Sequence, residues 1–147
     1  MTPENTEKLY QAFPMLYRGK DKSLQESSMS WGFECDDGWF DLIWKLSHAI
    51  EECARCAGLK PDSDRWPEAI QVKQKFGSLR VHLINQTDEM CALINSASDA
   101  SMTICETCGA IAAQTVVINR WVQALCHQCH EIKAKLDYGS VFSNENC

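Results

Sequence analysis

Cys105-Glu-Thr-Cys108 and Cys126-His-Gln-Cys129 are the two stretches that decide the fold of the C-terminal third of this chain. In each stretch two residues separate a pair of cysteines, so that one tight turn directs both sulfurs toward a single point. Seventeen residues lie between the two pairs. Four thiolates brought together in this way form the closed tetrahedral site that Zn²⁺ favours. The sequence therefore predicts one structural zinc ion, bound by Cys105, Cys108, Cys126 and Cys129.

The residues around the cysteine pairs predict a zinc ribbon or treble-clef-like element. Residues 111–118 and 121–125 are predicted as two strands joined by a turn at Asn119-Arg120. Residues 127–137 are predicted as a helix, which places the second cysteine pair at a helix N-terminus, where thiolates are stabilised. We assign residues 102–138 to the ribbon and its C-terminal helix, docked on the rest of the chain. Because four protein ligands leave no position for water, we expect the zinc to stabilise the fold.

Three other chemistries use similar cysteine patterns. Residues 126–130 match the C-x-x-C-H haem-attachment sequence, but that chemistry requires export and leaves Cys105 and Cys108 without a role. A dithiol redox site needs a single pair, whereas this chain has two matched pairs. An iron–sulfur cluster accepts the same four thiolates, and the spacing does not distinguish it from zinc.

A further C-x-x-C pair, Cys53 and Cys56, lies within a predicted helix, where residues three apart share a face without forming a turn. We expect these thiols to pack against the core. A second metal site completed by Cys35 or His48 is the alternative. The sequence assigns no role to the remaining cysteines, namely Cys35, Cys53, Cys56, Cys91 and Cys147.

Residues 1–101 predict an α+β body in which amphipathic helices pack on a small antiparallel sheet. The longest helix is predicted at residues 38–57, because apolar residues recur at steps of four and three, as in Trp39, Ile43, Leu46 and Ile50. Asp36 or Asp37 is expected to cap this helix. Two other helices are expected at residues 3–13 and 88–101, with Thr2 and Thr87 as their N-caps. Residues 18–30 are polar and are predicted as a surface loop.

A β-hairpin is predicted at residues 69–84. Gly77-Ser78 is a two-residue sequence typical of a type II′ turn, and this turn would pair Phe76 with Leu79 and Lys75 with Arg80. One face of the hairpin is then mainly apolar and includes Phe76. The opposite face is cationic and carries Lys73, Lys75, Arg80 and His82.

These cations predict a nearby anion, because like charges directly opposite one another on a hairpin repel. One possibility is an internal partner, such as Asp88, Glu89 or the acidic start of the helix at residues 38–57. A phosphate group or an acidic partner protein is the other. We therefore take Lys73, Lys75, Arg80 and His82 as candidate partner-binding residues. Arg120 and Trp121, at the ribbon turn, are further candidates. Trp44 lies off the apolar stripe of its helix, so it is either another candidate or packs in the core against the N-terminal segment.

The composition excludes several classes of function. The chain has 147 residues, is 45% hydrophobic and carries a net charge of −6, which disfavours broad adhesion to DNA or anionic membranes. No charged-then-apolar leader opens the sequence and no apolar run approaches the length of a membrane span. We therefore expect a cytoplasmic protein with reduced thiols. No nucleophile elbow, phosphate loop or histidine metal motif predicts an enzyme.

Three stretches together resemble a family of small bacteriophage and prophage proteins. They are residues 31–43 (WGFECDDGWFDLI), residues 72–80 (VKQKFGSLR) and the paired C-x-x-C ribbon. The resemblance covers roughly residues 31–130. It implies a viral or prophage origin and a setting in the host cytoplasm, and it implies no particular activity.

The leading hypothesis from the sequence is a non-enzymatic, zinc-binding phage-type accessory protein that binds a protein partner. The partner would be a host enzyme, such as a nucleic-acid-processing enzyme, or an antiviral defence complex that it inhibits. The alternative is a nucleic-acid-binding zinc-ribbon protein that uses Lys73, Lys75 and Arg80. An enzyme whose catalytic groups the sequence does not reveal is a third hypothesis.

Overall fold

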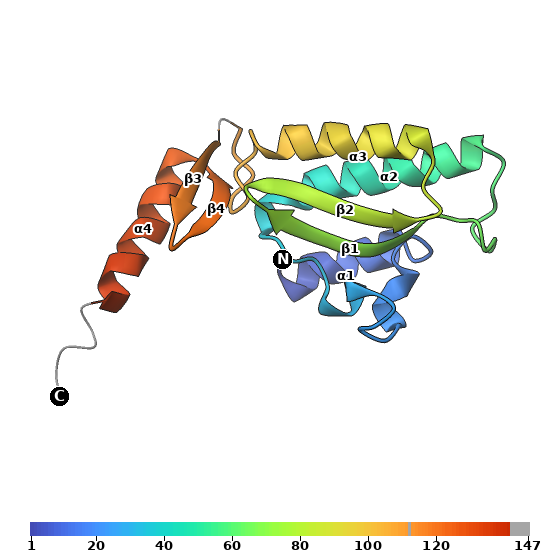
Figure 1. Ribbon diagram of the computed structural model, residues 1–147, viewed down its shortest axis with the longest axis horizontal. Helices are drawn as coiled ribbons and strands as arrows, with labels where there is room; N and C mark the ends of the chain where they lie inside the picture. Colours follow the sequence, from blue (N-terminus) through green and yellow to red (C-terminus); the bar gives the residue numbers. More distant parts are fainter. Residues whose placement is uncertain (112, 142–147) are drawn as a thin grey trace.

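The computed structural model describes residues 1–111 and 113–141 (Figure 1), and within them the chain forms four α-helices and two two-stranded antiparallel sheets. This is the α+β class that the sequence predicts. The first sheet is the hairpin of β1 (Glu68–Lys75) and β2 (Ser78–Ile84). α3 (Asp88–Ser101) runs along its β2 side beside α2 (Phe40–Cys56), and α1 (Pro3–Ala12) lies toward the β1 side.

The second sheet belongs to the ribbon, which lies at one end of the body (Figure 1). It pairs β3 (Gln114–Ile118) with β4 (Trp121–Leu125) around the predicted turn at Asn119-Arg120. β3 begins three residues later than the strand predicted from residue 111. The helix that follows, α4, extends over His127–Val141 and so is longer than the predicted residues 127–137.

Local signals for the helices are confirmed at α1 and α3. The Thr2 side chain accepts a hydrogen bond from the Asn5 amide, and the Thr87 side chain accepts one from the Met90 amide. The predicted apolar stripe of α2 is also confirmed, since its first four members are all buried: Trp39, Ile43, Leu46 and Ile50.

The predicted caps of α2 are wrong. A short 3₁₀ turn over Asp37–Trp39 precedes the helix, and neither acidic side chain caps it. The Asp37 carboxylate instead accepts hydrogen bonds from the Thr2 amide and hydroxyl. Asp36 contacts the ribbon, as described below. Both carboxylates therefore join segments that are distant in sequence.

Residues 18–30 are more structured than the predicted surface loop. They contain a 3₁₀ turn at Arg18–Asp21 and the start of another at Ser28–Trp31, and Met29 is completely buried. Arg18 and Lys22 both form ion pairs with the buried carboxylate of Glu68. The polar residues of this segment therefore interact with β1 as well as with solvent.

The predicted register of the body hairpin is also wrong. The turn residues are Phe76-Gly77, so Lys75 lies opposite Ser78 and Lys73 lies opposite Arg80. Phe76 and Gly77 both have positive φ, at 54° and 77°, as a type I′ turn requires. Phe76, predicted on the apolar face, is 69% exposed at the tip.

The turn of this hairpin packs against the ribbon. A Cβ atom at Gly77 would lie 3.3 Å from the Thr115 methyl group and 3.5 Å from a Val122 methyl group. The backbone of the turn therefore packs directly on the ribbon sheet.

Among the described residues, no helix combines the length and apolarity needed to cross a lipid bilayer.

Candidate metal centre and adjoining surfaces

The two predicted cysteine pairs meet in the structure. The sulfurs of Cys105, Cys108, Cys126 and Cys129 all lie within 4.8 Å of one another, and those of Cys108 and Cys126 are 3.7 Å apart. With metal–sulfur bonds of about 2.3 Å, tetrahedral sulfurs are about 3.8 Å apart. The group can therefore hold one metal ion, as the spacing predicts.

Local backbone geometry directs these sulfurs inward. Gly109, with φ at +77°, follows the first pair and lets its amide donate to the Cys105 carbonyl at 2.8 Å. The second pair opens α4, where the Cys129 amide lies 3.5 Å from the Cys126 sulfur. Each pair thus forms its own tight turn, and the β3–β4 hairpin between them brings the two turns together.

The thiols of this group do not titrate alike. Burial raises the pKa of Cys105, but amide groups of Cys126, Cys108 and Thr107 donate to its sulfur and together bring the pKa to about 7. Burial and the neighbouring sulfurs raise the pKa of Cys129. At Cys108 the Ala110 amide favours the thiolate, but burial and the Cys105 sulfur outweigh it and raise the pKa. Four thiolates therefore need a cation among them.

We expect the affinity of this site for Zn²⁺ to fall as the pH is lowered from 8 to 6. Thiols with a raised pKa hold their protons in the metal-free protein, and the metal must displace them. Each displaced proton weakens binding about tenfold for each unit by which the pH falls. The stabilisation by metal is accordingly present at higher pH and lost toward acid. Competition with a chromophoric chelator at several pH values measures this, and a flat profile would contradict it.

The first metal-binding turn docks directly on the start of α2. The Gly38 amide donates to the Glu106 carbonyl at 2.7 Å, and the Trp39 indole donates to the Ile104 carbonyl at 2.9 Å. A Cβ atom at Gly38 would lie 2.2 Å from the Cys105 carbonyl oxygen. Only glycine permits this contact.

Asp36 also joins the body to the ribbon. Its carboxylate accepts hydrogen bonds from the Thr107 hydroxyl at 3.1 Å and from the Lys133 ammonium at 2.9 Å. Its amide donates to the carboxylate of Glu106, whose pKa is raised by burial and by the charge of Asp36. Sequence reasoning missed this role of the Asp36-Asp37-Gly38 stretch.

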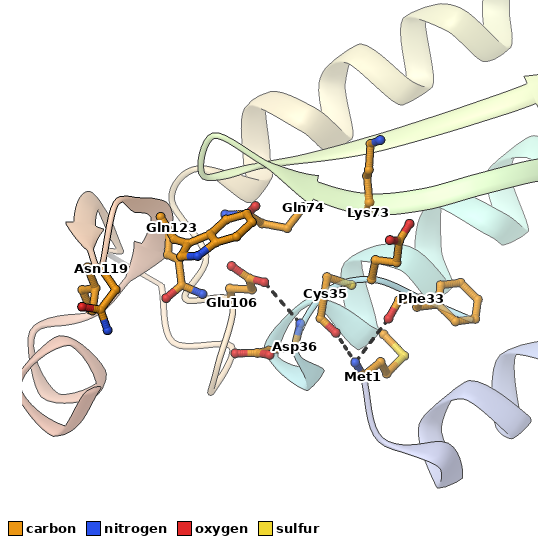
Figure 2. Close-up of a pocket in the computed structure, with 12 residues that line it drawn as sticks. Met1, Phe33, Cys35, Asp36, Lys73, Gln74, Glu106, Asn119 and Gln123 are labelled. Carbon is orange, nitrogen blue, oxygen red and sulfur yellow. Dashed lines mark hydrogen bonds between the residues drawn. The ribbon is translucent and has the colours of Figure 1, made fainter. Parts of the chain in front are cut away.

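A pocket of about 550 Å³ lies between the body and the ribbon (Figure 2). Three carboxylates line it, those of Glu34, Asp36 and Glu106, together with Lys73 and the indole of Trp121. The Met1 amine donates to the Phe33 and Cys35 carbonyls at its edge. The pocket is therefore mainly polar, with acidic side chains on several of its walls.

The cationic face predicted on the hairpin is present and open. Lys75, Arg80 and His82 are exposed and Lys73 is half-buried. Within the described residues none of the four forms an ion pair, so the proposed internal partners Asp88, Glu89 and the start of α2 do not neutralise them. The Lys75 ammonium lies over the Phe76 ring, 5.4 Å from its centre.

The turn of the ribbon places two further candidate residues, Arg120 and Trp121, next to the tip of the body hairpin. Arg120 and Trp121 are exposed, and they line a second cavity together with Lys75 and Phe76. We call Lys73, Lys75, Phe76, Arg120 and Trp121 the hairpin–ribbon surface. Sequence reasoning missed Phe76, and its position directly before Gly77 in the turn was the signal that could have identified it.

Trp44 lies elsewhere. Its ring packs edge-on against Phe13 of the α1 end, with ring centres 5.1 Å apart, and also contacts Phe40. It remains 37% exposed and lines a separate cavity between α1 and α2. The structure therefore does not join Trp44 to the hairpin–ribbon surface.

The second C-x-x-C pair forms no metal group with Cys35 or His48 in the described part of the chain. Cys35 is buried, and burial raises its pKa to about 12. Cys53 is half-buried with its sulfur 3.9 Å from the Thr87 hydroxyl, whereas Cys56, predicted to face the core, is exposed. Cys147 lies outside the described residues.

Comparison with known proteins supplies no homologous site for this chain. No family model matches it, and no curated protein or solved structure matches it. The residues of the chain itself therefore carry the functional conclusions.

Proposed function

We propose that this protein is a non-enzymatic, zinc-stabilised accessory protein of phage type that acts by binding a protein partner through the hairpin–ribbon surface. One observation carries the proposal: Trp121, 71% exposed, lies beside the exposed Phe76 on a surface assembled from two separate hairpins. Large aromatic side chains held in this way are typical anchors of protein interfaces.

The metal group supports a structural role for the ion. Four cysteine ligands complete a tetrahedral shell and leave no position for a substrate or for water. The ion then fixes the ribbon, and the ribbon presents Arg120 and Trp121. On this proposal, zinc promotes partner binding indirectly, because it holds the ribbon rigid.

Preorganisation of the surface supports the same conclusion. The side-chain amide of Gln74 donates to the Val122 carbonyl, and Gly77 packs against Thr115. These contacts fix the hairpin tip against the ribbon before any partner arrives. A surface that is already ordered loses little conformational entropy on binding, which favours affinity.

The charges next to the surface favour a protein over nucleic acid. Trp121 also lines the pocket that contains the exposed Glu34, so a cationic patch and an acidic side chain adjoin across one indole ring. A protein partner can carry both charges, whereas a nucleic acid is uniformly anionic. The net charge of −6 acts in the same direction.

A nucleic-acid-binding protein is the second candidate, favoured by Lys73, Lys75 and Arg80, which form no ion pair within the part of the chain that the structure describes. This function predicts binding that weakens with salt, with a logarithmic slope of roughly −0.7 to −0.9 for each phosphate contacted. Absence of a gel shift at low salt would exclude it.

In the phage setting implied by the sequence resemblance, the partner is a host enzyme or antiviral defence complex that the protein inhibits in the host cytoplasm. The test is capture of partners from bacterial lysate on the zinc-loaded protein. We expect a stoichiometric protein partner that is lost with Trp121→Ala and kept with Trp31→Ala, a matched control because Trp31 is also 71% exposed. Recovery of no partner, or equal capture by both variants, would count against the proposal.

A further inference from the structure

We infer that the segment recognised by the hairpin–ribbon surface is an acidic stretch of polypeptide with one large apolar side chain, which inserts between Phe76 and Trp121. This inference rests on the proposed function and specifies the chemistry of the partner. It follows from the shape of the cavity, from the backbone conformation of its lining and from the charges around it.

The cavity lies between the turn of the body hairpin and the turn of the ribbon hairpin. Its volume is about 470 Å³, and its walls include Phe76, Trp121 and Val122. The first two side chains are 69% and 71% exposed. An apolar side chain placed here would cover both rings, and burial of that surface is the main source of affinity in such contacts.

The backbone shows that these turns are not built for stability alone. Phe76 has φ at +54° and Arg120 has φ at +67°, both in the left-handed region. Two-residue hairpin turns of this type favour glycine, asparagine or aspartate, because a bulky side chain is strained there. Each turn therefore keeps a large side chain at an unfavourable position, and each of these side chains lines the cavity. Strain of this kind is found where a side chain serves binding.

The charges at the rim select an acidic segment. Lys75 and Arg120 line the cavity, and neither forms an ion pair within the described residues. Carboxylates on either side of an apolar anchor would meet these two cations. Beyond Trp121 the surface becomes acidic at the exposed Glu34. The anionic part of the ligand is accordingly short, which separates it from a nucleic acid strand.

The test titrates zinc-loaded, ¹⁵N-labelled protein with defined probes. They are blocked pentapeptides of sequence DEFDE, DEADE and KKFKK, and a twelve-nucleotide oligothymidylate. NMR spectra report the Trp121 indole and the Lys75 and Phe76 amides. We expect DEFDE to shift these signals saturably and to bind at least about tenfold more tightly than DEADE, KKFKK or the oligonucleotide.

Two variants locate the site without threatening the fold. Phe76→Asn and Arg120→Gly replace strained residues with ones suited to positive φ, so we expect thermal midpoints no lower than that of the unaltered protein. Each should weaken DEFDE binding at least about tenfold. Trp31→Ala and Lys60→Gln change an exposed aromatic residue and an exposed cation elsewhere and should leave binding unchanged.

Tighter binding of KKFKK or of oligothymidylate, or an unchanged affinity for DEFDE in Phe76→Asn, would overturn the inference. So would the absence of any shift with DEFDE. If lysate capture still depends on Trp121 in any of these cases, the proposed function survives and only the acidic chemistry fails. If capture does not depend on Trp121 while DEFDE binds, the proposed function fails by itself.

Discussion

Replacement of Cys126 by serine is expected to release the metal ion and to unfold the ribbon from about residue 103 onward. Zinc binding contributes on the order of 10–16 kcal/mol to small zinc domains, whereas a whole domain is commonly stable by only about 5–15 kcal/mol. β3 and β4 form a two-stranded sheet, which is marginal in water without further support. Loss of one ligand should therefore cost more free energy than the folding stability of the ribbon, so the ribbon should unfold.

Metal content and amide hydrogen exchange measure this outcome. The Cys126→Ser protein should contain less than stoichiometric zinc, and the amides of β3 and β4 should lose their protection. The amides of β1 and β2 should keep most of theirs, because the core around Leu9, Met29 and Ile43 lies within the body. Cys56→Ser, at the exposed cysteine of the other pair, is the control and should bind a full equivalent of zinc. Full zinc content in Cys126→Ser would refute the assignment.

Replacement of Gly38 by alanine should detach the metal-binding turn from the body. The new Cβ atom would lie 2.2 Å from the Cys105 carbonyl oxygen, 2.5 Å from the Glu106 carbonyl oxygen and 2.6 Å from the Gly109 amide nitrogen. All three are backbone atoms, which cannot rotate away as a side chain can. We expect a loss of about 3 kcal/mol or more in the free energy of unfolding.

Urea unfolding of the zinc-loaded protein checks this value, and Gly58→Ala provides the matched control. Gly58 has φ at +75°, but a Cβ atom there would meet nothing within 4 Å. Its replacement should therefore cost only the backbone strain, about 1–2 kcal/mol. If Gly38→Ala were no more destabilising than Gly58→Ala, close docking of the turn on α2 would not be important for stability.

The two substitutions separate two roles of the metal centre. Cys126→Ser removes the ion, whereas Gly38→Ala leaves all four ligands and disturbs only their attachment to the body. Both should weaken partner binding if the hairpin–ribbon surface is the binding site, because each displaces Trp121 relative to Phe76. Zinc content then distinguishes loss of the ion from loss of docking.

The four cysteines that can hold a metal ion were predictable from sequence because the geometry of each pair is local. Two residues between cysteines let one tight turn bring both sulfurs together where the chain is not held in the middle of a helix, and Gly109 completes the first of these turns. The apolar stripe of α2 and the N-caps Thr2 and Thr87 were predictable for the same reason, since each depends on residues within a few positions of one another.

The hairpin register, the exposure of Phe76 and the roles of Asp36 and Gly38 were decided by tertiary structure. Asp36 and Gly38 bond to residues of the metal-binding turn about seventy positions away in the chain, and no local pattern records such a contact. Gly77 has φ at +77°, which favours glycine, and a Cβ atom there would come within 3.3 Å of the Thr115 methyl group of the ribbon. The sequence by itself thus determined the metal-binding residues and the fold class. Only the packing of the ribbon on the body determined which side chains meet at its surface.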